Sequence, residues 1–140
     1  MLIGEFHHNL DNKNRLAMTS KLLESLKDEV IVTRGFEKCL LVYPKEKWES
    51  IIAKFSELTI TKSDTRKFMR ILLSGATSCK FDGQNRICIP GVLKTYAKIE
   101  KEVAILGIDD HLEIWSEDAY NEFLDENLES FAEIAEGIYE

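Results

Sequence analysis

The pentapeptide Asp11-Asn12-Lys13-Asn14-Arg15 returns 71 positions later as Asp82-Gly83-Gln84-Asn85-Arg86. The flanking sequence repeats as well, and the matching pairs include Gly4 with Gly75, Leu16 with Ile87, Leu22 with Leu93 and, after small shifts in register, Gly35 with Gly107. Self-similarity of this kind is typical of a structural unit that has been duplicated. The sequence therefore predicts one module written twice.

Each copy predicts the same series of short strands and helices. The runs Gly4 to Leu10 and Gly75 to Phe81 favour strands, and a polar turn separates each from a second short strand. Because Asn and Gly tolerate the positive φ that hairpin turns require, we expect a β-hairpin in each copy. Short helices starting at Thr19-Ser20 and Pro90-Gly91 follow, and further β-rich runs are Val30 to Val32, Leu40 to Tyr43, Val103 to Leu106 and Leu112 to Trp115.

A longer helix is predicted at the end of each copy. Apolar residues recur at intervals of three and four from Trp48 to Leu58 and from Tyr120 to Ile138, and Ser63 to Leu73 is predicted to form a connecting helix. We therefore expect an α+β fold with a first module at residues 1–58, a connecting helix at 59–74 and a second module at 75–140. No Gly, Ser or Pro-rich linker separates the copies, which favours one pseudo-symmetric compact unit.

The charge of the chain is unevenly distributed. The net charge of −7 would argue against a polyanionic partner. However, residues 1–100 hold 17 Lys and Arg against 12 Asp and Glu, whereas residues 101–140 hold one Lys against 13 acids. We expect the acidic segment to be the solvated face of a helix, so the first hundred residues keep the positive excess that a nucleic acid attracts.

Other classes of function find little support in the sequence. The neighbouring His7 and His8 would point to opposite faces of a strand, and the three cysteines lack a metal-ligand spacing, so we expect no metal and reduced thiols. No run of about 18 apolar residues and no signal segment occurs, which argues against a membrane location. Asp11 and Asp82 would stay ionised beside Arg and make poor acids. We therefore expect that the protein is not an enzyme and that it binds no cofactor or small-molecule substrate.

An Asp and an Arg four residues apart across a loop admit two interpretations. The Asp side chain can accept backbone hydrogen bonds and pair with the Arg, which would order the loop without any ligand. Alternatively, a rigid loop can carry Arg into the major groove of DNA, where its guanidinium can bond guanine, while a Lys contacts phosphate. A single copy would favour the first interpretation. Common ancestry could preserve a structural turn in both copies, but a doubled exposed cation also suits a periodic ligand, and DNA is such a ligand.

The two loops are not expected to contribute equally. We predict that Asp11 and Asp82 structure the loops, that Lys13 and Arg15 make the main contact and that Arg86 is largely structural. The candidate DNA-binding residues are Asn12, Lys13, Asn14, Arg15, Gln84, Asn85 and Arg86.

Several motifs together resemble one bacterial family. They are the strand from Gly4 to Asp11, the doubled Asp-x-x-x-Arg, Arg34-Gly35-Phe36 before Cys39 to Pro44, and Leu112 to Ser116. In this combination, which covers nearly the entire chain, they resemble the MraZ family of transcriptional regulators. The resemblance implies two swapped-hairpin modules of the AbrB and SpoVT type, assembled into a ring. It also implies a cytoplasmic, nucleoid-associated regulator that binds short tandem repeats of double-stranded DNA upstream of its own division and cell-wall operon.

A second function stays open. The chain could be an AbrB-like interaction module, antitoxin-type or scaffold, that docks a partner through its acidic C-terminal helix, although core packing or self-association would also explain the apolar stripe of that helix. For a DNA binder, a cyclic homo-oligomer that presents several Arg15 loops would raise the avidity of weak single contacts by roughly 10²- to 10⁴-fold.

Overall fold

The computed structural model describes residues 1–139, and its two halves contain the same order of elements except that η1 of the first half has no counterpart between β7 and β8. The first half runs β1 (Leu2–Asn9), β2 (Arg15–Ala17), α1 (Ser20–Leu26), β3 (Glu29–Arg34), η1 (Phe36–Lys38), β4 (Leu40–Pro44), α2 (Lys45–Lys54), η2 (Phe55–Glu57) and α3 (Ser63–Ser74). The second half runs β5 (Thr77–Lys80), β6 (Arg86–Cys88), α4 (Gly91–Tyr96), β7 (Glu102–Asp109), β8 (Leu112–Ser116), α5 (Glu117–Asn127), η3 (Leu128–Ser130) and α6 (Phe131–Tyr139).

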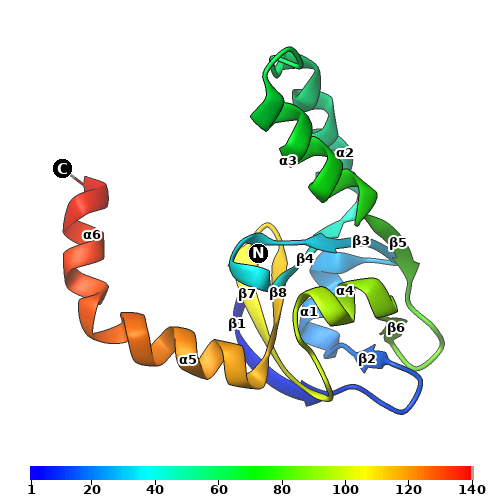
Figure 1. Ribbon diagram of the computed structural model, residues 1–140. Coiled ribbons are helices and arrows are strands. Elements are labelled where there is room, and N and C mark those ends of the chain that lie inside the picture. Colours follow the sequence, from blue (N-terminus) through cyan, green and yellow to red (C-terminus); the bar gives the residue numbers. More distant parts are fainter. Residues whose placement is uncertain (140) are drawn as a thin grey trace.

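The two halves share their sheets. The larger sheet has six antiparallel strands in the order β1-β7-β8-β4-β3-β5, and β2 pairs with β6 in a separate two-stranded ribbon (Figure 1). Each half places its first strand beside the third strand of the other half, so β1 pairs with β7 and β5 pairs with β3. The strands β4 and β8 meet at the centre. The mixed α/β architecture is therefore a single unit in which neither half can form its sheet alone.

The prediction of a β-hairpin within each copy is wrong, because the two strands of each predicted hairpin pair with strands of the other copy. The strand β1 pairs with β7 from Leu2↔Asp109 to Asn9↔Glu102, and the short β2 pairs with β6 through Arg15↔Cys88, Leu16↔Ile87 and Ala17↔Arg86. Leu16 and Ile87 are 0% and 1% exposed. An isolated hairpin is at best marginally stable in water, whereas pairing across the copies buries both of these side chains in a shared core.

Both halves contribute to that core. Its fully buried large side chains include Leu16, Leu22, Leu40, Ile87, Leu93, Ile105, Leu112 and Ile114. Smaller clusters lie under the helices at either end: Trp115 and Tyr120 join α5 to the sheet, and Ile31, Trp48 and Leu72 join α2 and α3 to it.

The helices after β4 and β8 end sooner than their apolar stripes predict. The helix α2 stops at Lys54 and continues as the 3₁₀ turn η2, and α5 stops at Asn127 and reaches α6 only through η3. At the second break, the Asn127 side chain donates to the Phe123 carbonyl at 2.9 Å. Such side-chain bonds to the backbone compete with helix propagation. The predicted connecting helix is confirmed as α3.

Three features project from the sheets in different directions (Figure 1). The helices α2 and α3 stand together at one end, and the rings of Phe55 and Phe68 meet edge to face between them at 6.0 Å. The helices α5 and α6 lead away from the sheet, and the β1–β2 and β5–β6 loops lie together opposite α2 and α3 (Figure 1). Within the described residues, no helix is long and apolar enough to cross a membrane.

Candidate nucleic-acid interface

The first loop is closed by the side chain of Asp11. Its Oδ1 accepts hydrogen bonds from the backbone N–H groups of Lys13 and Arg15, both at 2.9 Å, and its Oδ2 accepts from Nε of Arg15 at 2.6 Å. The bond from the Arg15 backbone N–H is the main reason that the pKa of Asp11 falls to about 2. Asp11 is therefore ionised at neutral pH and cannot act as a general acid.

The second loop repeats this geometry. Asp82 accepts from the backbone N–H groups of Gln84 and Arg86 and from Nε of Arg86, all at 2.9 Å. The backbone N–H of Arg86 is the main cause of the lowered pKa of Asp82. As the turn residues predict, Asn14 and Asn85 adopt positive φ of 59° and 61°, in the left-handed region that Asn tolerates.

The loops interlock into one surface. The Met18 N–H donates to the carbonyl of Asn85 at 2.9 Å, and the Ile89 N–H donates to the carbonyl of Asn14 at 2.8 Å. Figure 1 shows the two loops side by side beyond the β2–β6 ribbon. Because each loop accepts a hydrogen bond from the residue that follows the ribbon strand of the other copy, the candidate residues of both copies share a fixed relative position.

The two guanidinium groups differ in their partners. Arg86 uses Nε for Asp82 and places Nη1 3.7 Å from Oδ2 of Asp11, so it links the carboxylates of both loops. Arg15 pairs only with Asp11 among residues 1–139. The Arg15 side chain is also more exposed, at 32% against 24% for Arg86.

The remaining candidate residues are distributed around these arginines. Asn12, Lys13, Gln84 and Asn85 are exposed at the loop tips, while Asn14 is partly buried. Lys94 on α4 was not predicted, yet its Nζ donates to Oδ1 of Asn14 at 3.0 Å. No sequence signal marks this contact, because 80 residues separate the two positions and Lys94 belongs to no motif.

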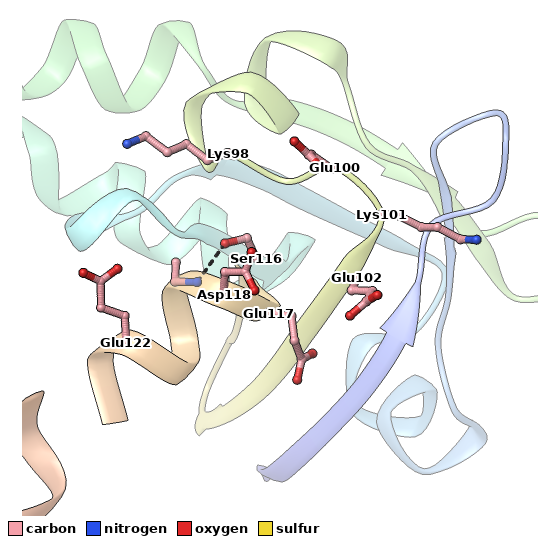
Figure 2. A pocket seen from close by; sticks show the side chains of 9 residues that line it. Lys98, Glu100, Lys101, Glu102, Ser116, Glu117, Asp118 and Glu122 are labelled. Atoms are coloured by element: carbon pink, nitrogen blue, oxygen red, sulfur yellow. Dashed lines mark hydrogen bonds between the residues drawn. The ribbon is translucent and has the colours of Figure 1, made fainter. Parts of the chain in front are cut away.

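A second concave surface lies at the start of α5. It has a volume of about 390 Å³, and Figure 2 shows its side chains, most of them carboxylates, spread around the rim. The dashed bond is the helix cap, in which Ser116 Oγ accepts from the Ala119 N–H at 3.1 Å. Across the described chain, no three His, Cys, Asp or Glu side chains are placed to hold a metal ion. The excess of carboxylates would repel an anionic ligand.

Comparison with known proteins accounts for the duplicated plan. The family model described as "MraZ protein, putative antitoxin-like" matches twice, over residues 1–71 and 72–138. The chain is 42% identical over 138 residues to a protein of Lactobacillus helveticus (strain DPC 4571) named "Transcriptional regulator MraZ", with 99% of this chain and 96% of the relative covered. Both findings confirm the resemblance that the sequence motifs indicated. The chain belongs to the MraZ family.

Proposed function

We propose that the protein is a sequence-specific DNA-binding regulator of transcription. One observation carries the proposal: the paired loops form one exposed surface, in which each Asp orders the backbone around an Arg. The relative from Lactobacillus helveticus, named a transcriptional regulator, agrees with this role.

In this proposal, the first loop reads the DNA sequence. Arg15 bonds the edge of a guanine in the major groove, because its guanidinium fork matches the O6 and N7 acceptors of that base. Lys13 and Asn12 contact phosphate oxygens, and Asn14 supports the tip through Lys94. The Asp11 contacts fix the loop before DNA arrives, so binding costs little conformational entropy.

The second loop has mainly a supporting role. Arg86 holds Asp82 and Asp11 together and thereby aligns the two tips. Gln84 and Asn85 are exposed and complete the surface towards phosphate. Asp11 and Asp82 structure the loops and do not contact DNA.

The proposed target is an array. Two swapped-hairpin modules, at 1–58 and 75–140 with a connecting helix at 59–74, make one subunit, and a cyclic homo-oligomer presents several Arg15 loops to short tandem repeats. The repeats lie upstream of the protein's own division and cell-wall operon, at the nucleoid in the cytoplasm. Linking several weak contacts raises avidity by roughly 10²- to 10⁴-fold, which offsets the net charge of −7.

Footprinting and titration test this proposal together. The protein should protect the repeats in its own upstream region, and its affinity for a duplex of those repeats should fall steeply as salt rises. A shuffled duplex of the same length and composition is the control for sequence-specific recognition. Equal affinity for the two duplexes would reject sequence-specific binding.

A second candidate function is a protein-interaction module of the antitoxin or scaffold type. The observation that favours it is α6, whose apolar residues Phe131 and Ile138 are 68% and 71% exposed. Such a module would bind its partner through α6 and show little salt-dependent affinity for DNA.

A further inference from the structure

The arginines and aspartates of the two loops balance one another in charge. The carboxylate of Asp11 accepts from Arg15 at 2.6 Å. The carboxylate of Asp82 accepts from Arg86 at 2.9 Å. Backbone N–H bonds lower the pKa of both carboxyl groups, so both are ionised at neutral pH. The uncompensated positive charge that attracts the phosphates of DNA must therefore come from other side chains.

Two ammonium groups at the first loop supply this charge. Lys13 and Lys94 have no carboxylate partner within residues 1–139. Lys13 belongs to the loop itself, whereas Lys94 lies on α4 of the second copy and donates from Nζ to Oδ1 of Asn14 at 3.0 Å. Because Asn14 is neutral, the bond orients the ammonium group of Lys94 without neutralising it. An ammonium has three donors, and Asn14 occupies one of them.

The bond to Asn14 holds Lys94 at the loop. Asn14 is itself fixed, because its N–H donates to the Asp11 carbonyl at 3.0 Å and its carbonyl accepts from the Ile89 N–H at 2.8 Å. The side chains of Asn14 and Lys94 are both half-buried. Part of the rotamer freedom that a lysine loses on binding an anion is therefore already lost in the free protein, which favours binding.

The second loop shows that the turn does not need this cation. Asn85 has φ of 61°, against 59° for Asn14, and its N–H likewise donates to the carbonyl of the loop aspartate at 3.0 Å. The repeat counterpart of Lys94 is Leu23, an apolar side chain that packs against the core and lies beside Asn85. The second loop thus forms the same turn without an ammonium group. A structural role in the turn does not account for the charge of Lys94.

We propose that Lys94 bonds a phosphate of the DNA backbone, so that the first-loop site combines side chains of both copies. The inference rests on the proposed function, in which Arg15 reads the edge of a base. Lys94 adds a point charge beside that contact, and a phosphate bond of this kind fixes the register of the loop on the duplex without reading sequence. In this role Lys94 touches DNA itself and does more than support Asn14.

Three variants test the contact in titrations of the repeat duplex and of a shuffled duplex at several salt concentrations. Lys94→Met removes the ammonium group and keeps an unbranched side chain. It should weaken binding to both duplexes several-fold and reduce the magnitude of the log–log salt slope by about 1 for each engaged loop. Lys94→Arg keeps the charge and should keep the slope of the wild type. Lys54→Met is the matched control, because Lys54 is exposed on α2, opposite the loops (Figure 1), and should leave the slope unchanged.

Asn14→Gly separates a phosphate contact from support of the loop tip. Glycine adopts the positive φ of this position and removes the oxygen to which Lys94 donates. If Lys94 bonds phosphate, adding Lys94→Met to Asn14→Gly should still reduce the slope by about 1 for each engaged loop. A residue that acted only through Asn14 would have no further effect in this background.

Two results would overturn the inference. One is a salt slope that Lys94→Met leaves unchanged while circular dichroism shows a folded protein. The other is an effect of Lys94→Met that disappears in the Asn14→Gly background, which would assign Lys94 to loop support alone. Failure of the proposed function gives a different result, because the wild type would then bind the shuffled duplex as tightly as the repeats. A wild type without affinity for either duplex would reject both proposals.

Discussion

Asp11 and Asp82 each accept two backbone N–H bonds and one guanidinium bond, and the loops that they close follow the same path. The positions around these carboxylates differ in charge. The first loop carries Lys13 where the second carries Gln84, and Lys94 contacts Asn14 whereas its repeat counterpart, Leu23, is an apolar side chain beside Asn85. The two loops share one backbone path, and at these two pairs of equivalent positions the cations are found only at the first loop.

This difference separates what a loop needs to fold from what it needs to bind an anion. The Asp and Asn positions determine the turn, because they satisfy its N–H groups and adopt positive φ, and both copies retain them. The cations at Lys13 and Lys94 lie at the first loop, where Lys94 reaches it from the second copy, and Gln84 and Leu23 stand at the equivalent positions of the second loop.

Arg15→Ala should reduce affinity for the tandem repeats by about 100-fold or more. A bidentate contact to guanine is worth about 1–3 kcal/mol, and the loss repeats at every subunit that engages the DNA. Fluorescence anisotropy at one fixed salt concentration measures the affinity, and sedimentation should show unchanged assembly.

Arg86→Ala is the matched variant in the second loop. Because Arg86 links Asp82 to Asp11, its loss should lower Tm more than the loss of Arg15 does and reduce DNA affinity less. Equal losses of affinity in the two variants would show that both loops read the DNA.

Lys13→Ala should weaken binding by several-fold for every DNA sequence. A lysine on a phosphate releases a counterion when DNA binds, so the magnitude of the log–log salt slope should fall by about 1 for each engaged loop. Gln84→Ala, at the equivalent position, should leave the slope unchanged. A slope that Lys13→Ala does not alter would remove Lys13 from the phosphate contact.

Asp11→Asn should change how the free energy of unfolding depends on pH. The pKa of Asp11 falls from 3.8 to about 2 on folding. Its ionised carboxylate therefore stabilises the native state above pH 3.8, and this contribution disappears as the pH falls towards 2. The gap between the unfolding free energies of wild type and variant, from denaturant titrations, should narrow over that range. Because the pKa of Asp82 is also lowered, the gap between wild type and Asp82→Asn should narrow in the same direction as the pH falls. A gap independent of pH would mean that ionised Asp11 does not stabilise the fold.

The repeat and the turn chemistry were visible in the sequence because they depend on local rules. Positive φ at Asn14 and Asn85 follows from residue type, and the strand and helix order follows from apolar periodicity. The doubled Asp-x-x-x-Arg therefore predicts two ordered loops from the sequence alone.

The exchange of strands between copies followed no local rule. The runs that favour strands locate β1 and β2 but carry no information on their partners, and the nearest partner in sequence is the wrong one. The contact between Lys94 and Asn14 depends on that exchange, since only the interlocked arrangement brings α4 to the first loop. An apolar stripe also does not reveal the break between α5 and α6, where the Asn127 side chain donates a hydrogen bond to the Phe123 carbonyl.

The smallest predicted effect concerns the start of the helix after each loop. Thr19 and Pro90 are equivalent in the repeat and have nearly the same backbone, with φ, ψ of −72°, 154° and −58°, 142°. The Thr19 hydroxyl is buried without a hydrogen-bond partner in the described chain, and its N–H makes no backbone hydrogen bond there. Proline would remove the orphaned hydroxyl and fix a φ that the residue already adopts.

Thr19→Pro should therefore increase the free energy of unfolding by about 1 kcal/mol, because it also lowers the entropy of the unfolded chain. Pro90→Thr should decrease it by a similar amount, and neither variant should alter DNA affinity, since both positions lie outside the loop tips. Chemical denaturation measures the change in the free energy of unfolding for both variants. If Thr19→Pro destabilises the protein, Met18 does not have the extended backbone that a residue before proline requires, and the two copies differ in conformation as well as in charge.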